Sequence, residues 1–356
     1  MHRREFLKST AALSALALLP HRFARAEGGW RTFEIVTQID VLQPEGATRV
    51  WVPAPLTAER SFQKPLGNRW SSSSERVKFH TDQNYGAGMV WAEWPAGETP
   101  TLTVTSRVAT RDIAVDLTRP GSATPEQPAV LQKYLQPTEL APTDGIVKQT
   151  SDGIVKGGRT PLEKARAIYE WIVDNTYRNP ETRGCGVGDI RFMLETKDLG
   201  GKCADLSALF VGLARAAGIP ARDVYGIRVA DSKLGYKSLG KSGDITKAQH
   251  CRAEVYLEGH GWVPMDPADV RKVVLEEGGG KPLNDPMVVA ARQRLFGSWE
   301  MNWMAYNTAS DLALPDAARG SVPFLMYPQC ETSEGRVDSL DPEHFRYRIT
   351  SREITT

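Results

Sequence analysis

The sequence has almost no net charge, and it is poor in the residue types that build disulfide scaffolds or metal sites. Its 356 residues include 44 basic and 43 acidic side chains, a formal charge of +1. Without a field of one sign, binding to nucleic acid or coating of an anionic membrane is disfavoured. Four cysteines are too few for a disulfide-built fold of this length, and they lack the paired CxxC spacing of zinc sites. We therefore expect no nucleic-acid partner.

The N-terminal apolar run is too short to cross a membrane. It covers residues 11–19, whereas a spanning helix needs roughly 20 residues. Arg3 and Arg4 precede the run, and a cleavage site of the A-x-A type follows at 24–26. This order is typical of a twin-arginine secretory signal. We expect residues 1–26 to be a signal peptide, the protein to be periplasmic or secreted by a bacterium, and no stable membrane insertion after signal removal.

Long helical patterns are missing from residues 30–117, where apolar and polar residues alternate. The first alternating run contains Phe33, Ile35, Thr37, Ile39 and Val41. Short runs separated by turns rich in Pro, Gly and Ser predict an all-β sandwich domain over 27–118. Residues 119–142 begin with a segment rich in Pro, Gly, Ser and Thr and are expected to be a linker. The remainder, 143–356, is expected to be a catalytic domain.

A helix with a functional first turn is predicted to begin at Cys203. Gly200 and Gly201 provide a glycine pair before it, which we expect to be flexible, and Gly218 with Pro220 ends the helix. Its apolar stripe consists of Leu206, Leu209, Phe210, Leu213 and Ala217. A helix N-terminus favours a thiolate over a thiol, and its free N–H groups can stabilise an oxyanion. A cysteine taken alone is more often core material, so the interpretation depends on partners elsewhere.

His250 is the histidine best placed to serve such a cysteine. It begins a strand over 250–257, and the segment that follows indicates a β-hairpin ending at Asp266. With a three-residue loop at 258–260, Arg252 faces Asp266, and His250 is a diagonal neighbour of Asp266 on the same face. A two-residue loop would put Asp266 on the other face. We expect the three-residue loop.

Four segments of the sequence resemble the transglutaminase-like superfamily: 201–205, 215–222, 250–257 and 261–267. The resemblance spans roughly 155–270. It implies an α+β, papain-like core in which a nucleophile helix packs on an antiparallel sheet, here preceded by the all-β sandwich. It also implies a triad without metal or cofactor, in which Cys203 is the nucleophile, His250 the base and then the acid, and Asp266 the group that orients His250.

The function expected from this resemblance is that of an exported cysteine acyl-transfer enzyme. We favour hydrolysis of an amide or peptide bond through a thioester, with a peptide, protein or amide as substrate. Cross-linking of amines, as in a transglutaminase, is the first alternative. A noncatalytic cell-envelope scaffold that retains the triad is the second.

Some residues are expected to lie outside the site. Alternation along the strand puts Cys251 on the face opposite His250, so we exclude it from the catalytic set. One disulfide is possible among Cys185, Cys251 and Cys330; sequence does not choose the pair, and Cys251–Cys330 is our guess. Arg222 and Arg228 are expected on a solvated strand face. Residues 290–356 are expected to form a helix and then strands added to the catalytic core, with the tryptophans there in packing roles.

Overall fold

The computed structural model describes residues 29–119 and 121–354, so the predicted signal peptide lies outside the described residues. Its strands are β1 (Arg31–Val41), β2 (Thr48–Pro53), β3 (Gln63–Ser72), β4 (Val77–Thr81), β5 (Gly88–Trp94), β6 (Thr101–Thr110), β7 (Ile113–Ala114), β8 (Tyr177–Arg178), β9 (Gly200–Gly201), β10 (Ala221–Arg228), β11 (Gly243–Asp244), β12 (Gln249–Leu257), β13 (Gly261–Met265), β14 (Ser298–Trp299), β15 (Trp303–Asn307), β16 (Gln329–Glu331), β17 (Arg336–Val337) and β18 (Phe345–Ile354). Its helices are α1 (Pro128–Lys133), α2 (Gly145–Val155), α3 (Pro161–Asn175), α4 (Ile190–Thr196), α5 (Cys203–Ala216), the 3₁₀ helix η1 (Lys237–Leu239), α6 (Pro267–Glu276) and α7 (Pro286–Arg294).

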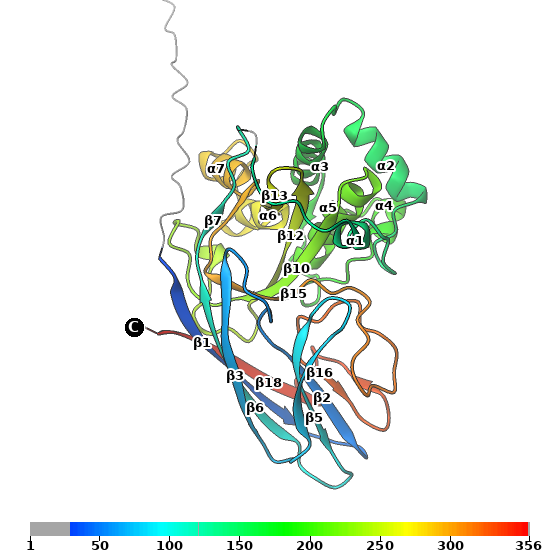
Figure 1. Cartoon of the computed structure of the whole chain (residues 1–356), viewed down its shortest axis with the longest axis vertical. Coiled ribbons are helices and arrows are strands. Elements are labelled where there is room, and N and C mark those ends of the chain that lie inside the picture. Colours follow the sequence, from blue (N-terminus) through cyan, green and yellow to red (C-terminus); the bar gives the residue numbers. More distant parts are fainter. Residues whose placement is uncertain (1–28, 120, 355–356) are drawn as a thin grey trace, which may run out of the picture.

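Two five-stranded sheets form the β-rich part, in the strand orders β11-β18-β1-β6-β3 and β17-β16-β2-β5-β4 (Figure 1). The alternation of β1 is the cause: Phe33, Ile35, Ile39 and Val41 are all buried. Residues of both sheets share one apolar core, which includes Ile39, Val50, Val90 and Leu102. The predicted β-sandwich is therefore present.

The C-terminal strands complete this sandwich instead of extending the core expected to be catalytic. β18 pairs antiparallel with β1 from Thr32↔Ile354 to Val41↔Phe345, and β16 pairs with β2 (Figure 1). Of the strands after α7, only β15 joins the sheet of β12, so the expectation for residues 290–356 is wrong in its second half. Alternation specifies which face of a strand is buried but not which strand lies beside it.

The α/β core is built on the antiparallel sheet β13-β12-β10-β15. Helix α5 packs against β12 and β10, and α2 and α3 pack against α5. Every residue of α5 from Cys203 to Ala216 is buried, as expected of a helix that is largely apolar on all sides. The mixed α/β architecture thus confirms the predicted fold class. Among the described residues, no helix has the length and hydropathy needed to cross a membrane.

The segment expected to be a linker is fixed against the hairpin of β12 and β13. The N–H of Ala123 donates to Gly259 O at 2.7 Å, and Trp262 Nε1 donates to Glu126 Oε2 at 3.0 Å. β1 also reaches beyond the sandwich, because Phe33 and Ile35 belong to the same apolar cluster as α5. The two parts therefore share structure at their junction.

Candidate active site

Cys203 is the first residue of α5, directly after the N-cap Lys202. The preceding β9 pairs with β8, so the glycine pair is part of a ladder. A Cβ on Gly201 would lie 2.5 Å from the Asp205 Cβ, although the backbone there is not left-handed. Gly201 is needed because the Asp205 side chain approaches its Cα too closely for a Cβ. The role of the pair is therefore close packing, and not the flexibility that we expected.

Asp205 ties the tip of α5 to the loop before it. Its carboxylate accepts the N–H groups of Lys202 at 3.0 Å, and of Val187 and Gly188 at 2.9 Å each. The N–H of Ala204 donates to Cys185 O at 2.8 Å. Loop 185–188 is thereby held beside Cys203, and the N–H of Cys203 itself makes no hydrogen bond within the described chain.

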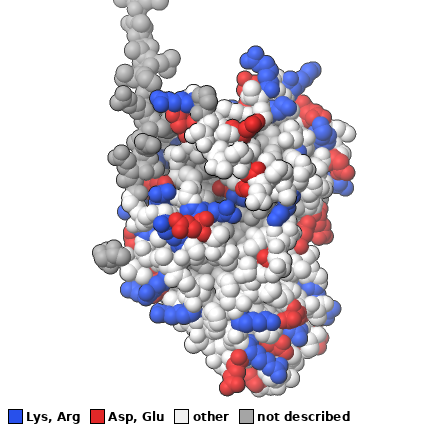
Figure 2. Space-filling view, in the orientation of Figure 1, with Lys and Arg blue, Asp and Glu red and all other residues white. Residues whose placement is uncertain are grey.

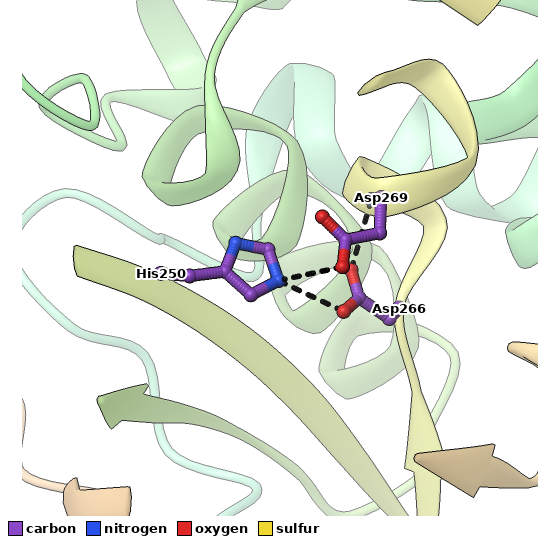
Figure 3. Close-up of side chains that lie close together, drawn as sticks. All are labelled: His250, Asp266 and Asp269. Atoms are coloured by element: carbon purple, nitrogen blue, oxygen red, sulfur yellow. Dashed lines mark hydrogen bonds and ion pairs between the residues drawn. The ribbon is translucent and has the colours of Figure 1, made fainter. Parts of the chain in front are cut away.

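The predicted hairpin parity is confirmed, since Ala253 pairs with Met265 and Leu257 with Gly261. His250 and Asp266 therefore meet on one face, with His250 Nε2 2.8 Å from Asp266 Oδ2. Both side chains are buried. Figure 3 shows that the other ring nitrogen, Nδ1, points away from the carboxylates. That nitrogen is the one free to serve a sulfur.

A second carboxylate, Asp269, was missed by the sequence analysis. Its Oδ2 lies 3.4 Å from His250 Nε2, and its N–H donates to Asp266 Oδ1 at 2.9 Å (Figure 3). Asp266 is the N-cap of α6, and Pro267 is the first helical residue. Asp269 is the third helical residue, so its N–H faces the capping side chain of Asp266 and the two acids lie together at the start of the helix. An acid three residues after the Asp of an Asp-Pro pair was the available signal.

Two buried arginines balance the two aspartates. Arg228 Nη2 lies 2.6 Å from Asp269 Oδ1, and Arg252 Nε lies 3.3 Å from Asp266 Oδ2. The expected solvated face for Arg222 and Arg228 is wrong, because both are buried. Arg222 pairs with Glu254 at 2.6 Å. Strand alternation identifies the face of these arginines but not the acids that allow a charge to be buried.

Tryptophans hold the backbone on which the site depends. Trp303 Nε1 donates to His250 O at 2.8 Å, and Trp299 Nε1 donates to Met265 O at 3.3 Å. The guanidinium of Arg252 lies over the Trp303 ring at 4.7 Å. Both indoles are buried, which confirms their packing role.

The electrostatics favour a thiolate beside an imidazolium. Interactions with the thiols of Cys185 and Cys251 lower the pKa of Cys203 well below its usual range, and His250 adds to this effect against the opposing influence of burial. Burial lowers the pKa of His250, but the charges of Asp269 and Asp266 outweigh it and raise the pKa to about 9. Between these two pKa values, the sulfur is ionised while the ring is protonated.

Cys251 is a correction to the sequence analysis. The expectation excluded it from the site, yet its thiol interacts with the Cys203 sulfur, and burial followed by this interaction raises the pKa of Cys251 well above its usual range. Alternation puts the side chain opposite His250, and α5 covers that face of β12. The guessed Cys251–Cys330 disulfide is also wrong: all four cysteines are free, and Cys330 is buried in the sandwich core.

The side chains of His250, Asp266 and Asp269 are close enough to be tested as metal ligands. Their ligand atoms lie within 4.8 Å of one another. The carboxylates, however, already face Arg228 and Arg252, so a cation would have to displace guanidinium groups from a buried site. We interpret the cluster as a hydrogen-bonded charge network.

Comparisons with known proteins bear on the family and the fold. Residues 148–267 match the model of the Transglutaminase-like superfamily. An uncharacterized protein of Haemophilus influenzae is 34% identical over 372 residues, covering 98% of this chain and 99% of that protein. The chain therefore belongs to one family with the Haemophilus influenzae protein, and residues 148–267 are a transglutaminase-like domain.

One solved structure supports the fold, and a second matches more weakly. A protein of Cytophaga hutchinsonii, named "Putative Cysteine Protease", matches with a TM-score of 0.57 at 16% identity and covers 92% of each chain. The periplasmic domain of TgpA from Pseudomonas aeruginosa matches with a TM-score of 0.34 at 16% identity, covering 67% of this chain and 92% of that domain.

Proposed function

We propose that this protein is an exported cysteine hydrolase that cleaves an amide or peptide bond through a thioester. The observation that carries the proposal is the position of Cys203 at the N-terminus of α5, served by His250, whose Nε2 is 2.8 Å from Asp266. The pattern of residues 1–26 supports export, and the substrate is a peptide, protein or small amide.

The reaction follows from the two ionised groups. Cys203 Sγ attacks the carbonyl carbon, and the electron pair moves to the carbonyl oxygen. As the tetrahedral intermediate collapses, the amine leaves with the proton from His250 Nδ1, and a thioester to Cys203 remains. Water then gives a proton to Nδ1 and attacks the thioester, which releases a carboxylic acid and restores the thiolate. Asp266 keeps Nε2 occupied throughout, so Nδ1 handles both proton transfers.

Two groups are suited to hold the oxyanion. The first is the unpaired N–H of Cys203. The second is Gln249 Nε2, which is buried and has no hydrogen-bond partner in the described part of the chain. Gln249 stands two residues before Cys251, whose thiol interacts with the Cys203 sulfur, so both side chains lie on one face of β12. A buried amide without a partner is costly unless a ligand completes it.

Replacing Gln249 by Leu should lower kcat for amide turnover by about 10²- to 10³-fold, the usual effect of losing one oxyanion donor. Alkylation of Cys203 by iodoacetamide forms no oxyanion, and its rate should therefore stay unchanged. Steady-state kinetics and mass spectrometry of the alkylated peptide measure the two effects. Unchanged kcat in the variant would remove Gln249 from the mechanism.

The ionised thiol can be tested without a known substrate. We expect iodoacetamide to alkylate Cys203 rapidly at pH 6–7, because its pKa is lowered well below that of a free cysteine, about 8.5. Cys330 in the same chain is the internal control, because burial raises its pKa to about 12. Alkylation of Cys203 that becomes appreciable only near pH 8.5 would favour a noncatalytic scaffold.

A further inference from the structure

A small pocket lies against the first two turns of α5. Ala204 and Ala208, one turn apart, form part of its lining, together with Val187 and Gly188 of the loop held by Asp205. Ala204 directly follows Cys203, and the charge of Cys203 acts on Asp223 in the lining, so the pocket lies near the proposed nucleophile. The cavity measures about 20 Å³, which suits one group of about the size of a water molecule.

The polar part of the pocket is acidic, and no basic side chain of the described residues lines it. Asp223 and Asp311 line it, with Tyr225 and Phe324 supplying apolar surface. None of the lining residues in the described structure is Lys, Arg or His. Arg215, the basic residue whose charge acts on Asp223, directs its Nε to Ala221 O and its Nη1 to a second backbone oxygen.

Asp223 stands apart from the other buried acids of this core. Its side chain is 6% exposed, and its Oδ1 has no hydrogen-bond partner among the described residues. Asp266 and Asp269, by contrast, have ionic partners. Burial raises the pKa of Asp223 to about 7, which outweighs the lowering by Arg215. A carboxyl left without a partner beside a nucleophile is a position that a ligand would complete.

We propose that this pocket is a substrate subsite for a primary ammonium group, bound by Asp223 with Asp311 adding negative charge. The inference rests on the proposed function and names the class of its substrates: amides or peptides with a protonated amine close to the scissile bond. An ammonium is a compact three-donor cation that matches the size of the cavity, whereas a guanidinium is larger and planar. The amine is either a free α-amino terminus or the end of a lysine-like side chain, whose methylenes suit Tyr225 and Phe324.

The test measures protection of Cys203 from iodoacetamide at about pH 7.5, above the pKa of Asp223, about 7, and below that of an α-amino group, so that carboxylate and amines are both largely charged. Three probes are compared: alanyl-alaninamide, its N-acetyl derivative and N-acetyl-lysine methylamide. In the unaltered protein we expect one or both of the amines to slow alkylation. The protecting amine should act at a concentration tenfold or more below the concentration of N-acetyl-alanyl-alaninamide that gives the same protection. Which amine protects identifies the α-amino or the side-chain source.

Asp223→Asn keeps the shape of the side chain and removes its charge, and it should abolish the tenfold preference for the amine. Asp40→Asn, on an exposed position of β1, is the matched control and should retain the preference. Because the substitution at 223 also alters the field at Cys203, protection is expressed relative to each variant's own unprotected rate. The subsite would be overturned if both amine probes protected no better than the neutral N-acetyl-alanyl-alaninamide. It would also be overturned if the preference for the amine were undiminished in Asp223→Asn.

Turnover of the same probes separates this inference from the proposed function. Amine-specific protection without hydrolysis keeps the subsite and removes the hydrolase. Hydrolysis without amine preference keeps the hydrolase and removes the subsite. Acylation of the amine itself would support the subsite and change the reaction from hydrolysis to transamidation.

Discussion

Cys203→Ala should abolish turnover, with a loss in kcat on the order of 10⁶-fold, as expected when the nucleophile of a triad is removed. Interaction with Cys203 raises the pKa of Cys185 in the unaltered protein, and burial raises the pKa values of both neighbouring thiols, Cys185 and Cys251. The effect of burial persists in the variant, so we expect neither thiol to replace Cys203. Cys203→Ser should be nearly as inactive, since a hydroxyl at this position stays protonated. The measurement is release of amine from an amide or peptide substrate.

The same substitution at Cys330 is the matched control. Cys330 is also fully buried, but in the sandwich core, so Cys330→Ala should cost about 1 kcal/mol of stability and leave kcat unchanged. Thermal unfolding of both variants separates a lost nucleophile from a lost fold. Turnover by Cys203→Ala at the rate of the unaltered protein would end the acyl-transfer proposal.

The second large effect is expected at Asp269, the acid that sequence analysis overlooked. Asp269→Asn leaves Arg228 buried without an ionic partner, which should lower the free energy of unfolding by about 3–5 kcal/mol. Burial raises the pKa of Asp269, but Arg228 and His250 lower it well below its usual range. A carboxyl whose pKa is lowered by folding stabilises the fold at any pH above its unfolded-state pKa, here about 4. This stabilisation is lost as pH falls through the folded-state pKa, so it is fully present at neutral pH.

Asp269→Asn should also move the pH dependence of activity. Imidazolium is required for the proposed mechanism, so the rate should fall as pH rises through the pKa of His250, about 9. Next to burial, which acts against it, Asp269 is the strongest influence on that pKa, so removing its charge should shift the alkaline fall to lower pH. Asp266→Asn should act differently: it removes the 2.8 Å partner of Nε2 and should lower kcat by about 10⁴-fold.

Urea unfolding and pH–rate profiles measure both effects. Asp285→Asn, at the N-cap of α7, is the control and should change stability by less than about 0.5 kcal/mol, since Asn caps as well as Asp. A double variant, Asp269→Asn with Arg228→Met, should recover part of the stability without restoring the alkaline limb. An alkaline limb that stays near pH 9 in Asp269→Asn would show that Asp269 does not position the charge on His250.

The surface also carries acidic and basic side chains in nearly equal number. Lys and Arg are interspersed with Asp and Glu over the face seen in Figure 2, in agreement with the near-zero formal charge. Recognition in this protein is therefore expected to depend on local groups such as Asp223, and long-range attraction should contribute little.

Local signals were enough for the elements that present the triad. The capping box of Thr160 and Glu163 begins α3, and the glycine pair before an apolar stripe placed Cys203 at the start of α5. A three-residue loop set the parity that brings His250 to Asp266. Each of these features depends on a few neighbouring residues, because caps, turns and alternation are properties of local backbone geometry.

The tertiary structure alone decided what surrounds the triad. Arg228 with Asp269, the thiols of Cys185 and Cys251 at the nucleophile, and the unpaired Asp223 come together from segments distant in sequence. The return of β18 to β1 was decided in the same way. The chain thus determined by itself which residues face inward and where helices and strands begin; which inward residues meet depends on how sheets and helices pack, because the free energy of burying a charge or pairing a strand is set by partners that no local pattern names.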